Sequence, residues 1–362
     1  MGKKFKFNTK GIVMKKLMVG LVVAATTLNA NAIDISVTNV TCTGNYAATY
    51  NGSSICDQLD TEVQNLVEGD LPDVSIGKYG TGISNANGFA YRGLGSDYSD
   101  HFDIAAVKLG GGLAVEGDMN DAETASGFGI GAAMNIGVNM GILPVDKVGP
   151  VEMKKLDVFL SFVSQNLDQD LDDATVEGDL SYFGLMARYH LIEGIDSVPG
   201  NMLSWGGVYL HTGIQRSSWS VDFSQQFEDE TVDVNGQDAT FGNSSANFAI
   251  ESSSLTIPLE VSTYMRTAWA LTFFGGAGLD IVLSGNTDVD LDASGSVIGS
   301  DGGSYQTDIS ASESDSGEAD ATNFRAFGGL QLNLPFVRFT AQLNKGLGND
   351  LVGFNAGIKV LY

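Results

Sequence analysis

The chain has 362 residues, with 44 acidic residues against 19 basic ones and a formal net charge of −25. This charge argues against binding to nucleic acid or to anionic surfaces, and it favours divalent cations or basic partners. No stretch of 18 apolar residues is present, so any insertion into a membrane must use strands rather than helices.

Residues 1–32 have the pattern of a secretory signal peptide. Residues 1–16 contain six lysines and no acid, and an apolar run follows from Leu17 to Ala25. The sequence Ala30-Asn31-Ala32 is a small-x-small cleavage site, so we expect cleavage after Ala32. Both Met1 and Met14 are possible starts. The signal peptide carries six of the 19 basic residues and no acid, which leaves the mature chain with a net charge of −31.

Residues 33–101 are expected to form an N-terminal extension. Cys42 and Cys56, separated by thirteen residues, are predicted to form a disulfide that contributes about 3 kcal/mol; two free thiols are the alternative. Apolar residues at 55, 59, 63, 66 and 67 predict one helix over about 56–67, and a Gly- and Asn-rich path follows over 77–100. Residues 33–101 are interpreted as a luminal plug, a periplasmic cap, or an ordered segment without a role in transport.

From residue 102 to the C-terminus, runs of alternating apolar residues predict ten strands, because side chains of a strand alternate between its two faces. Each run has about the length that a tilted membrane strand needs. The predicted strands cover 104–115, 127–140, 154–165, 179–191, 203–219, 248–264, 268–284, 322–333, 336–344 and 354–362.

The connections between these strands alternate in kind. Those after the second, fourth, sixth and eighth strands are short, whereas 116–124, 166–178, 220–247 and 285–321 are acidic and contain no Lys or Arg. Short turns on one side and long loops on the other are typical of outer-membrane barrels. We therefore predict an all-β fold, a transmembrane antiparallel up-and-down β-barrel of about ten strands over 102–362, with eight or twelve strands left open. A soluble β-sandwich is the alternative.

The last predicted strand has one continuous apolar face and ends on an aromatic residue. In a bacterial barrel such a face is turned to lipid, and the terminal aromatic lies at the membrane interface. We expect this segment to be the assembly signal of the barrel, carried by Phe354, Ile358, Val360 and Tyr362.

The strongest candidates for metal ligands are carboxylates in two of the acidic connections. Oxygen-rich ligands suit Ca²⁺ or Mg²⁺, but the calcium-loop template counted from Asp288 fails, because it places Ala293 and Gly299 where Gly and Glu are needed. A solvated acidic loop is the alternative interpretation, and we expect no other cofactor. The candidate ligands are Asp288, Asp290, Asp292, Asp170 and Asp172.

Alternation also predicts which charged residues face the lumen. A barrel of this size is narrow and largely filled by side chains, so we expect charges of both signs to pair there in a structural network. A narrow pore that favours anions is the alternative. The predicted lumen residues are Lys108, Arg188, His190, His211, Glu260, Asp280, Arg325, Arg338 and Lys359.

An enzyme is not expected. Ten-stranded outer-membrane proteases carry acidic pairs and a His at the outer rim, but the topology places His101 and His190 at the periplasmic side and His211 in mid-strand. The sequence contains no nucleophile elbow, zinc-protease motif or phosphate loop.

The signal ending at Ala32, the rhythm of strands and loops, and the terminal segment 354–362 together resemble bacterial outer-membrane β-barrel proteins. The stretch from Asn85 to Tyr98 is similar to spirochaete surface-adhesin families. The resemblance implies an integral outer-membrane protein with its loops at the cell surface. We expect a structural or adhesive role, with an extracellular ligand or divalent cations at the acidic loops; a pore plugged by the N-terminal segment is the alternative. The expected partners are membrane lipid, lipopolysaccharide and the barrel-assembly machinery, and not nucleic acid.

Overall fold

The computed structural model describes ten segments of the chain, which together contain fifteen strands, one α-helix and two short 3₁₀ helices. Predictions that fall outside them, including the signal peptide, the helix at 56–67, Cys56, His101, Asp172 and Tyr362, are not addressed by the structure. The described residues are 39–44, 76–98, 104–117, 127–171, 174–196, 203–227, 229–234, 237–267, 270–299 and 306–361.

Ten antiparallel strands form a closed ring, which we call the barrel. Neighbours in the ring are also neighbours in the chain, apart from the inserted strands β4, β5, β9 and β12, and β15 closes the ring by pairing with β2. The prediction of an all-β, up-and-down barrel of ten strands is confirmed. The ring consists of β2 (Ala105–Glu116), β3 (Gly127–Asn139), β6 (Leu156–Leu171), β7 (Ala174–Asp196), β8 (Leu203–Phe227), β10 (Gln237–Thr267), β11 (Leu271–Gly299), β13 (Thr322–Asn333), β14 (Arg338–Gly346) and β15 (Val352–Leu361).

The outer surface of the barrel is a continuous apolar band to which every strand of the ring contributes. One exposed apolar side chain from each strand, between 37 and 58 % exposed, illustrates it: Leu109, Ile130, Leu160, Phe183, Ile214, Leu259, Phe273, Leu330, Phe339 and Phe354. A surface of this kind would be unstable in water, and it matches the lipid-facing band of a transmembrane barrel.

No helix in the described part of the chain is long and apolar enough to cross a membrane.

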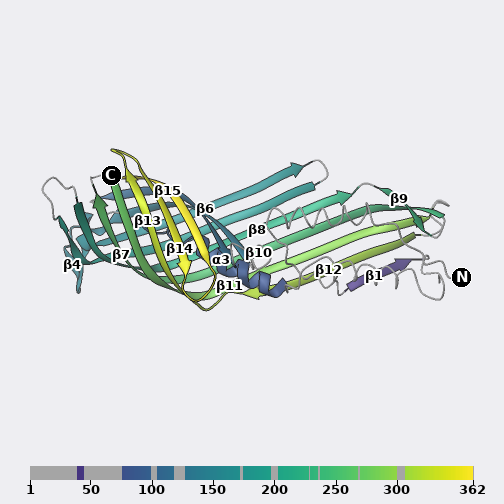
Figure 1. The fold of residues 1–362 in the computed structure, drawn as a ribbon, viewed down its shortest axis with the longest axis horizontal. Coiled ribbons are helices and arrows are strands. Elements are labelled where there is room, and N and C mark those ends of the chain that lie inside the picture. Colours follow the sequence, from purple (N-terminus) through teal and green to yellow (C-terminus); the bar gives the residue numbers. More distant parts are fainter. Residues whose placement is uncertain are drawn as a thin grey trace.

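The strands differ greatly in length, and this shapes the molecule. β14 has nine residues and β15 has ten, whereas β10 has 31 and β11 has 29. The strands β6, β7, β8, β10 and β11 therefore continue past the end of β13, β14 and β15 as a long sheet, which we call the extension (Figure 1).

Additional strands complete the extension at its edges. β11 pairs with β13 over Leu271–Ile281 and then with β12 (Gln306–Glu318) over Asn286–Ile298, so β12 takes the place of β13 beyond the barrel. β1 (Asn39–Gly44) adds to β12, and β9 (Glu230–Val234) adds to the tip of β10. Figure 1 shows β1 beside β12 along the lower border of the extension.

The expectation of long loops at 166–178, 220–247 and 285–321 needs correction, because most of these residues belong to strands. The physical reason lies in their alternation: along β11, Asp288, Asp290 and Asp292 are exposed, whereas Val289 between them is buried. Such a segment has one wet face and one dry face, which a sheet satisfies and a solvated loop does not.

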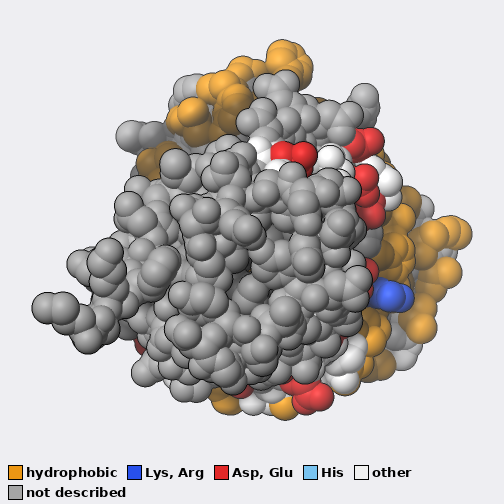
Figure 2. Space-filling model, turned by 90° about the vertical axis from the view of Figure 1, so that its right-hand side faces the viewer, with side chains coloured by type: hydrophobic (Ala, Val, Ile, Leu, Met, Phe, Trp, Pro, Cys, Tyr) orange, Lys and Arg blue, Asp and Glu red, His pale blue; other side chains and the backbone are white. Residues whose placement is uncertain are grey.

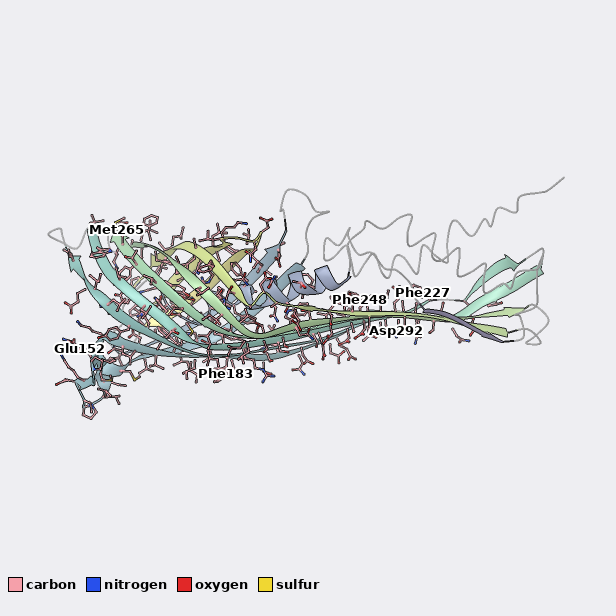
Figure 3. The ribbon with its side chains drawn as sticks, turned by 90° about the horizontal axis from the view of Figure 1, so that it is seen from below. Glu152, Phe183, Phe227, Phe248, Met265 and Asp292 are labelled. Carbon is pink, nitrogen blue, oxygen red and sulfur yellow. The ribbon has the colours of Figure 1, made fainter. Side chains whose placement is uncertain are left out.

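The two faces of the extension differ in chemistry. Its inner face, which continues the lumen face, carries the buried side chains Trp219, Phe248, Ile250 and Val289. Figure 3 shows Phe248 and Phe227 on one side of the long sheet and Asp292 on the other.

We call the opposite end of the barrel the turn end, because the strands are joined there by short connections. The connection from β3 to β6 is the most elaborate. It contains the 3₁₀ helices η2 (Met140–Ile142) and η3 (Met153–Lys155) and the small hairpin of β4 (Lys147–Val148) and β5 (Val151–Glu152). Ion pairs of Lys155 with Glu152 at 3.4 Å and with Glu193 at 2.9 Å fix this connection to the end of β7.

The α-helix α3 (Ile76–Ala90) occupies the first part of the Gly- and Asn-rich path, where no helix was expected. Its glycines make it a poor helix by propensity, but they allow close packing against the surrounding strands of the barrel and the extension. A Cβ added to Gly80 would lie 2.8 Å from the Gly317 nitrogen. On the strand side, a Cβ on Gly129 would lie 2.3 Å from the Ala86 carbonyl oxygen. The helix and β3 therefore touch backbone to backbone.

Candidate functional site

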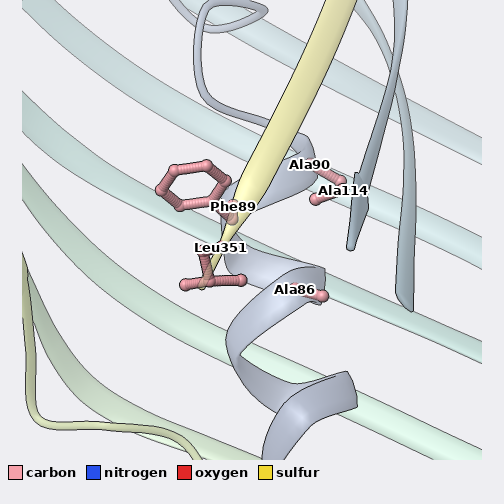
Figure 4. Close-up of a cluster of buried hydrophobic side chains, with 5 residues drawn as sticks. All are labelled: Ala86, Phe89, Ala90, Ala114 and Leu351. Carbon is pink, nitrogen blue, oxygen red and sulfur yellow. The ribbon is translucent and has the colours of Figure 1, made fainter. Parts of the chain in front are cut away.

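The lumen of the barrel contains a separate part of the same chain, residues 76–98, which we call the inner segment. Its first part is α3, which packs through Ala86, Phe89 and Ala90 against Ala114 of β2 and against Leu351 (Figure 4). All of these side chains are at most 2 % exposed. The helix is thus held at the end of the barrel from which the extension leaves.

Residues 91–98 continue from the helix into the barrel, and all of them are buried. Their conformation is irregular, so their carbonyl groups need partners outside the segment. Side chains of the barrel wall supply the donors: Asn355 to Ala90 O (2.8 Å), Asn344 to Arg92 O (3.3 Å), Lys108 to Gly93 O (2.6 Å) and Ser96 O (3.5 Å), Asn135 to Gly95 O (3.0 Å), and Arg188 to Asp97 O (2.6 Å).

The end of the inner segment packs on aromatic and polar side chains near the turn end. Tyr98 donates a hydrogen bond to Glu260 at 2.7 Å, and its ring centroid lies 4.6 Å from that of Phe327. His211 joins Ser96 and Ser262, with its Nδ1 at 2.8 Å from one hydroxyl and its Nε2 at 2.7 Å from the other. These contacts fix the position of residues 96–98 across the lumen.

The wall charges form a paired network around the inner segment. Arg325 contacts Glu260, and its Nε lies 3.2 Å from Asp280 Oδ2, while Arg92 of the inner segment approaches the same Asp280 oxygen at 2.9 Å. On the opposite wall, Arg188 binds Asp157 with its Nη2 at 2.7 Å. Buried charges of this kind are tolerated only when they are paired and hydrogen-bonded.

The nine lumen residues expected from alternation all face the interior of the barrel. His190 and Arg338 are half-buried; His190 stacks on Tyr209 with ring centroids 4.3 Å apart. The other seven are at most 8 % exposed: Lys108, Arg188, His211, Glu260, Asp280, Arg325 and Lys359. Six of these seven form two groups, with Glu260, Asp280 and Arg325 in one and Lys108, Arg188 and Lys359 in the other, whereas His211 bonds to Ser96 and Ser262.

Sequence reasoning missed several members of this network. Asp157 faces inward between Leu156 and Val158, so the same alternation that identified Lys108 would have found it. Arg92 and Asp97 belong to the irregular part of the inner segment, where no periodic pattern indicates which side chains point to the wall. Only the three-dimensional arrangement reveals them.

The inner segment also contacts the rim of the barrel, at the last residue of β2. Asn85 donates to Glu116 at 3.0 Å and to Asp320 at 3.2 Å, and its side-chain oxygen accepts from the Asp320 nitrogen at 2.8 Å. The pKa of Glu116 is raised to about 7, chiefly by burial and also by the carboxylates of Asp320 and Asp350, although the hydrogen bond from Asn85 acts in the opposite direction. A carboxyl that titrates near neutral pH therefore lies where the inner segment meets the rim.

A second candidate site is the outer face of the extension, which we call the acidic face. Its carboxylates align in rows across the strands: Asp168 is opposite Glu177, which is opposite Asp222, and Glu251 is opposite Asp288. All of the carboxylates described on this face are exposed: Asp168, Glu177, Asp179, Asp222, Glu251, Asp288, Asp290, Asp292 and Glu318. No Lys or Arg lies among them within the described rows.

The predicted metal ligands Asp288, Asp290 and Asp292 lie on this face, at alternate positions of β11. Asp170 belongs to β6, and its side chain is not described; Asp172 lies outside the described residues. Among the residues that the structure describes, no group of three or more His, Cys, Asp or Glu side chains is arranged to hold a metal ion. Divalent binding stays a prediction.

A comparison with protein families gives one match, to a family described as Lsa36-like, and this match extends over residues 37–362. The chain belongs to the Lsa36-like family. The match includes the barrel, the extension and the inner segment. No curated protein matches the sequence.

Solved structures similar to this Lsa36-like protein include the translocator domain of the autotransporter NalP from Neisseria meningitidis. It is 11 % identical, with a TM-score of 0.30, and the match covers 76 % of this chain and 93 % of that one. A major outer membrane protein from Thermus thermophilus is 12 % identical, with a TM-score of 0.26 and coverage of 58 % and 99 %. CarO from Acinetobacter baumannii is 10 % identical, with a TM-score of 0.26 and coverage of 72 % and 98 %.

Two further predictions concern positions near the ends of this Lsa36-like chain. Cys42 lies in β1, opposite Ile309 of β12, but its predicted partner Cys56 is outside the described residues, so the disulfide stays a prediction. Phe354, Ile358 and Val360 are exposed on the outer face of β15, the strand that closes the barrel. Their role in assembly is not addressed by the structure.

Proposed function

We propose that the protein is an integral outer-membrane anchor that displays the acidic face at the cell surface and binds positively charged ligands there. The observation that carries this proposal is the presence of nine exposed carboxylates on one face of the extension, five of which form three pairs directly opposite each other across the strands. Like charges directly opposite each other across strands are unfavourable, so the surface would be stabilised by a cationic partner.

The barrel and the extension have different surfaces, which supports different roles for the two parts. The apolar band fits the barrel into lipid, and about ten residues of each strand are enough to cross it. The rest of the long strands then stands in the aqueous medium. Figure 2, seen from the end of the long strands, has hydrophobic side chains at the outer edge of the molecule and Asp and Glu side chains at several places around it.

The filled lumen supports display rather than conduction. The inner segment is buried in the barrel and is hydrogen-bonded to β2, β3, β7, β14 and β15. Within the described residues, a cavity beside Asp97 has a volume of only about 10 Å³, roughly the room that one water needs. The proposal therefore assigns binding to the outer sheet face and not to a solute path.

Binding of a lysine decapeptide to the protein in detergent micelles tests this proposal. In the variant with Asp222→Asn and Asp290→Asn, the affinity should fall about three- to tenfold, the effect of losing two exposed ion pairs. Affinity should also fall as salt rises from 0.05 to 0.5 M, and millimolar Ca²⁺ should compete.

The matched control removes two negative charges from the turn end, with Asp146→Asn and Glu193→Gln. These residues are exposed, but they lie at the opposite end of the barrel from the acidic face. The control should retain the affinity of the wild type. An equal loss in both variants, or binding that does not change with salt, would contradict the assignment of the ligand to the acidic face.

A narrow pore plugged by the inner segment is the second candidate function, and the polar contacts between this segment and the wall favour it. Recordings in planar bilayers separate the two candidates. The display function predicts that the wild-type protein gives no stable openings, whereas regular single-channel steps in the wild type would favour the pore.

A further inference from the structure

Three cations lie side by side on the lumen wall, on neighbouring strands; we call them the cation row. Arg338 of β14 is opposite Lys359 of β15, which in turn is opposite Lys108 of β2. Lys359 is 1 % and Lys108 is 8 % exposed, and Arg338 is half-buried. Like charges opposite each other on adjacent strands repel, and burial strengthens the repulsion. Such a row requires a negative partner.

The buried acids of the described wall contact other cations. Asp157, Glu260 and Asp280 contact arginines on other parts of the wall, through Arg188 and Arg325. These acids belong to β6, β10 and β11, whereas the cation row belongs to β14, β15 and β2.

The negative partner is Asp97 of the inner segment. Its Oδ2 lies 2.5 Å from Lys359 Nζ, and its side chain is buried. Lys108 and Arg188 also attract this carboxylate, and Arg338 interacts with it. The carboxylate therefore lies among four cations of the wall, and it belongs to a part of the chain that is not part of the wall.

We propose that the cation row is an anion-binding site of the lumen wall, which Asp97 occupies as an internal ligand. The site would take a small monovalent anion such as a simple carboxylate. The cavity of about 10 Å³ next to Asp97 and Lys108 is also lined by the polar side chains of Thr340, Gln342 and Asn355, which donate hydrogen bonds to Gly357 O, Asn344 and Ala90 O respectively. This site is distinct from the acidic face and does not depend on what that face binds.

The chemistry gives a direct test, which is rescue of a truncated side chain by a free anion. Asp97→Ala removes the carboxylate and leaves room for formate next to Lys359. The full-length variant in micelles should unfold at a lower temperature than the wild type, and sodium formate should raise its midpoint saturably, by about 5 °C more than it raises that of the wild type.

The matched control is Asp320→Ala, which removes a carboxylate that also contacts the inner segment, through Asn85, but does not touch the cation row. Formate should shift the midpoint of this control no more than that of the wild type. Equal shifts for Asp97→Ala, the control and the wild type would overturn the proposal.

A double-mutant cycle keeps the proposal testable if Asp97→Ala does not fold. Asp97→Asn and Lys359→Met both conserve volume. Removal of Lys359 should recover part of the midpoint lost in Asp97→Asn, because it removes a buried cation that has lost its carboxylate. Losses that simply add would show that Asp97 is not the ligand of the cation row.

Discussion

Arg325 shows how a charge is retained inside a narrow barrel. It is fully buried, yet it contacts Glu260, Asp280 and Asn344, and each of these partners comes from a different strand. Guanidinium suits this position because its five donors are fixed in one plane. Removal of one partner from such a buried group generally costs about 3–5 kcal/mol, because an uncompensated charge is left behind. The network therefore binds β10, β11, β13 and β14 together from inside.

Glu116 leads to a prediction about pH. Burial raises its pKa from an ordinary value of 4.5 to about 7, so the folded protein holds a proton that the unfolded chain releases between these two values. Protonation of Glu116 therefore contributes to the free energy of unfolding. This contribution is present in full below about pH 4.5 and is lost as the pH rises through about 7. We expect the Glu116→Gln variant to be more stable than the wild type at pH 8, with the difference shrinking towards pH 5.

Denaturant unfolding of both proteins at pH 5 and pH 8 measures this difference. The matched control is Glu177→Gln, which neutralises a glutamate that is exposed on the acidic face and has no contact with the rim. A stability difference between the wild type and Glu116→Gln that does not change with pH would exclude Glu116 as the titrating group.

At the scale of elements, the contact between α3 and β3 depends on glycine on the strand. Gly127 and Gly129 face the helix, and a Cβ on either would lie within 2.4 Å of main-chain atoms of residues 82–86. Main chain cannot move aside as a flexible side chain can. We expect the Gly129→Val variant to form the barrel but to exclude the inner segment from its place, at a cost of about 3 kcal/mol.

Limited trypsin digestion reports whether the inner segment is docked, because Arg92 is buried in the folded protein. Cleavage at Arg92 should be fast in Gly129→Val. It should stay slow in Gly111→Val, where the new Cβ would face outward and lie at an ordinary 3.6 Å from its nearest neighbour. Equal protection in the two variants would mean that the helix can pack without the glycine.

Local sequence patterns determine the strands of the barrel but not the segment inside it. The ten barrel strands could be predicted because lipid on one side and polar neighbours on the other impose alternation on each strand by itself. The helix α3 could not, because its glycines suit only the narrow space between strands that come from distant parts of the chain. Asp97 was missed for the same reason, since its role depends on three strands distant in sequence.

The strands of the extension could be predicted from the sequence only in part. The alternation of Asp288, Asp290 and Asp292 with Val289 and Leu291 is itself a strand pattern. The sequence nevertheless favours a loop for this segment, because a membrane strand needs only about 9–11 residues and β11 exceeds that length. The thickness of the bilayer limits the part of a strand that crosses it, but it does not limit the strand.

At the scale of the whole molecule, the main feature is asymmetry. β10 has 31 residues and would be about 100 Å long, whereas β14 has nine and would be about 30 Å long. Only one side of the barrel is prolonged, and the helix α3 lies where the short side ends. The molecule thus combines a closed lipid-facing part with an open sheet, and the same strands form both.

The continuity of β10 and β11 from one part to the other has a mechanical consequence. Their pairing runs from Thr267 and Leu271 at the turn end to Ala239 and Gly299 in the extension, interrupted only by two register shifts. A load pulling on the tip would act along these strands, at right angles to the hydrogen bonds between them. The bonds would then share the force in shear, instead of breaking one after another as they do when strands are peeled apart.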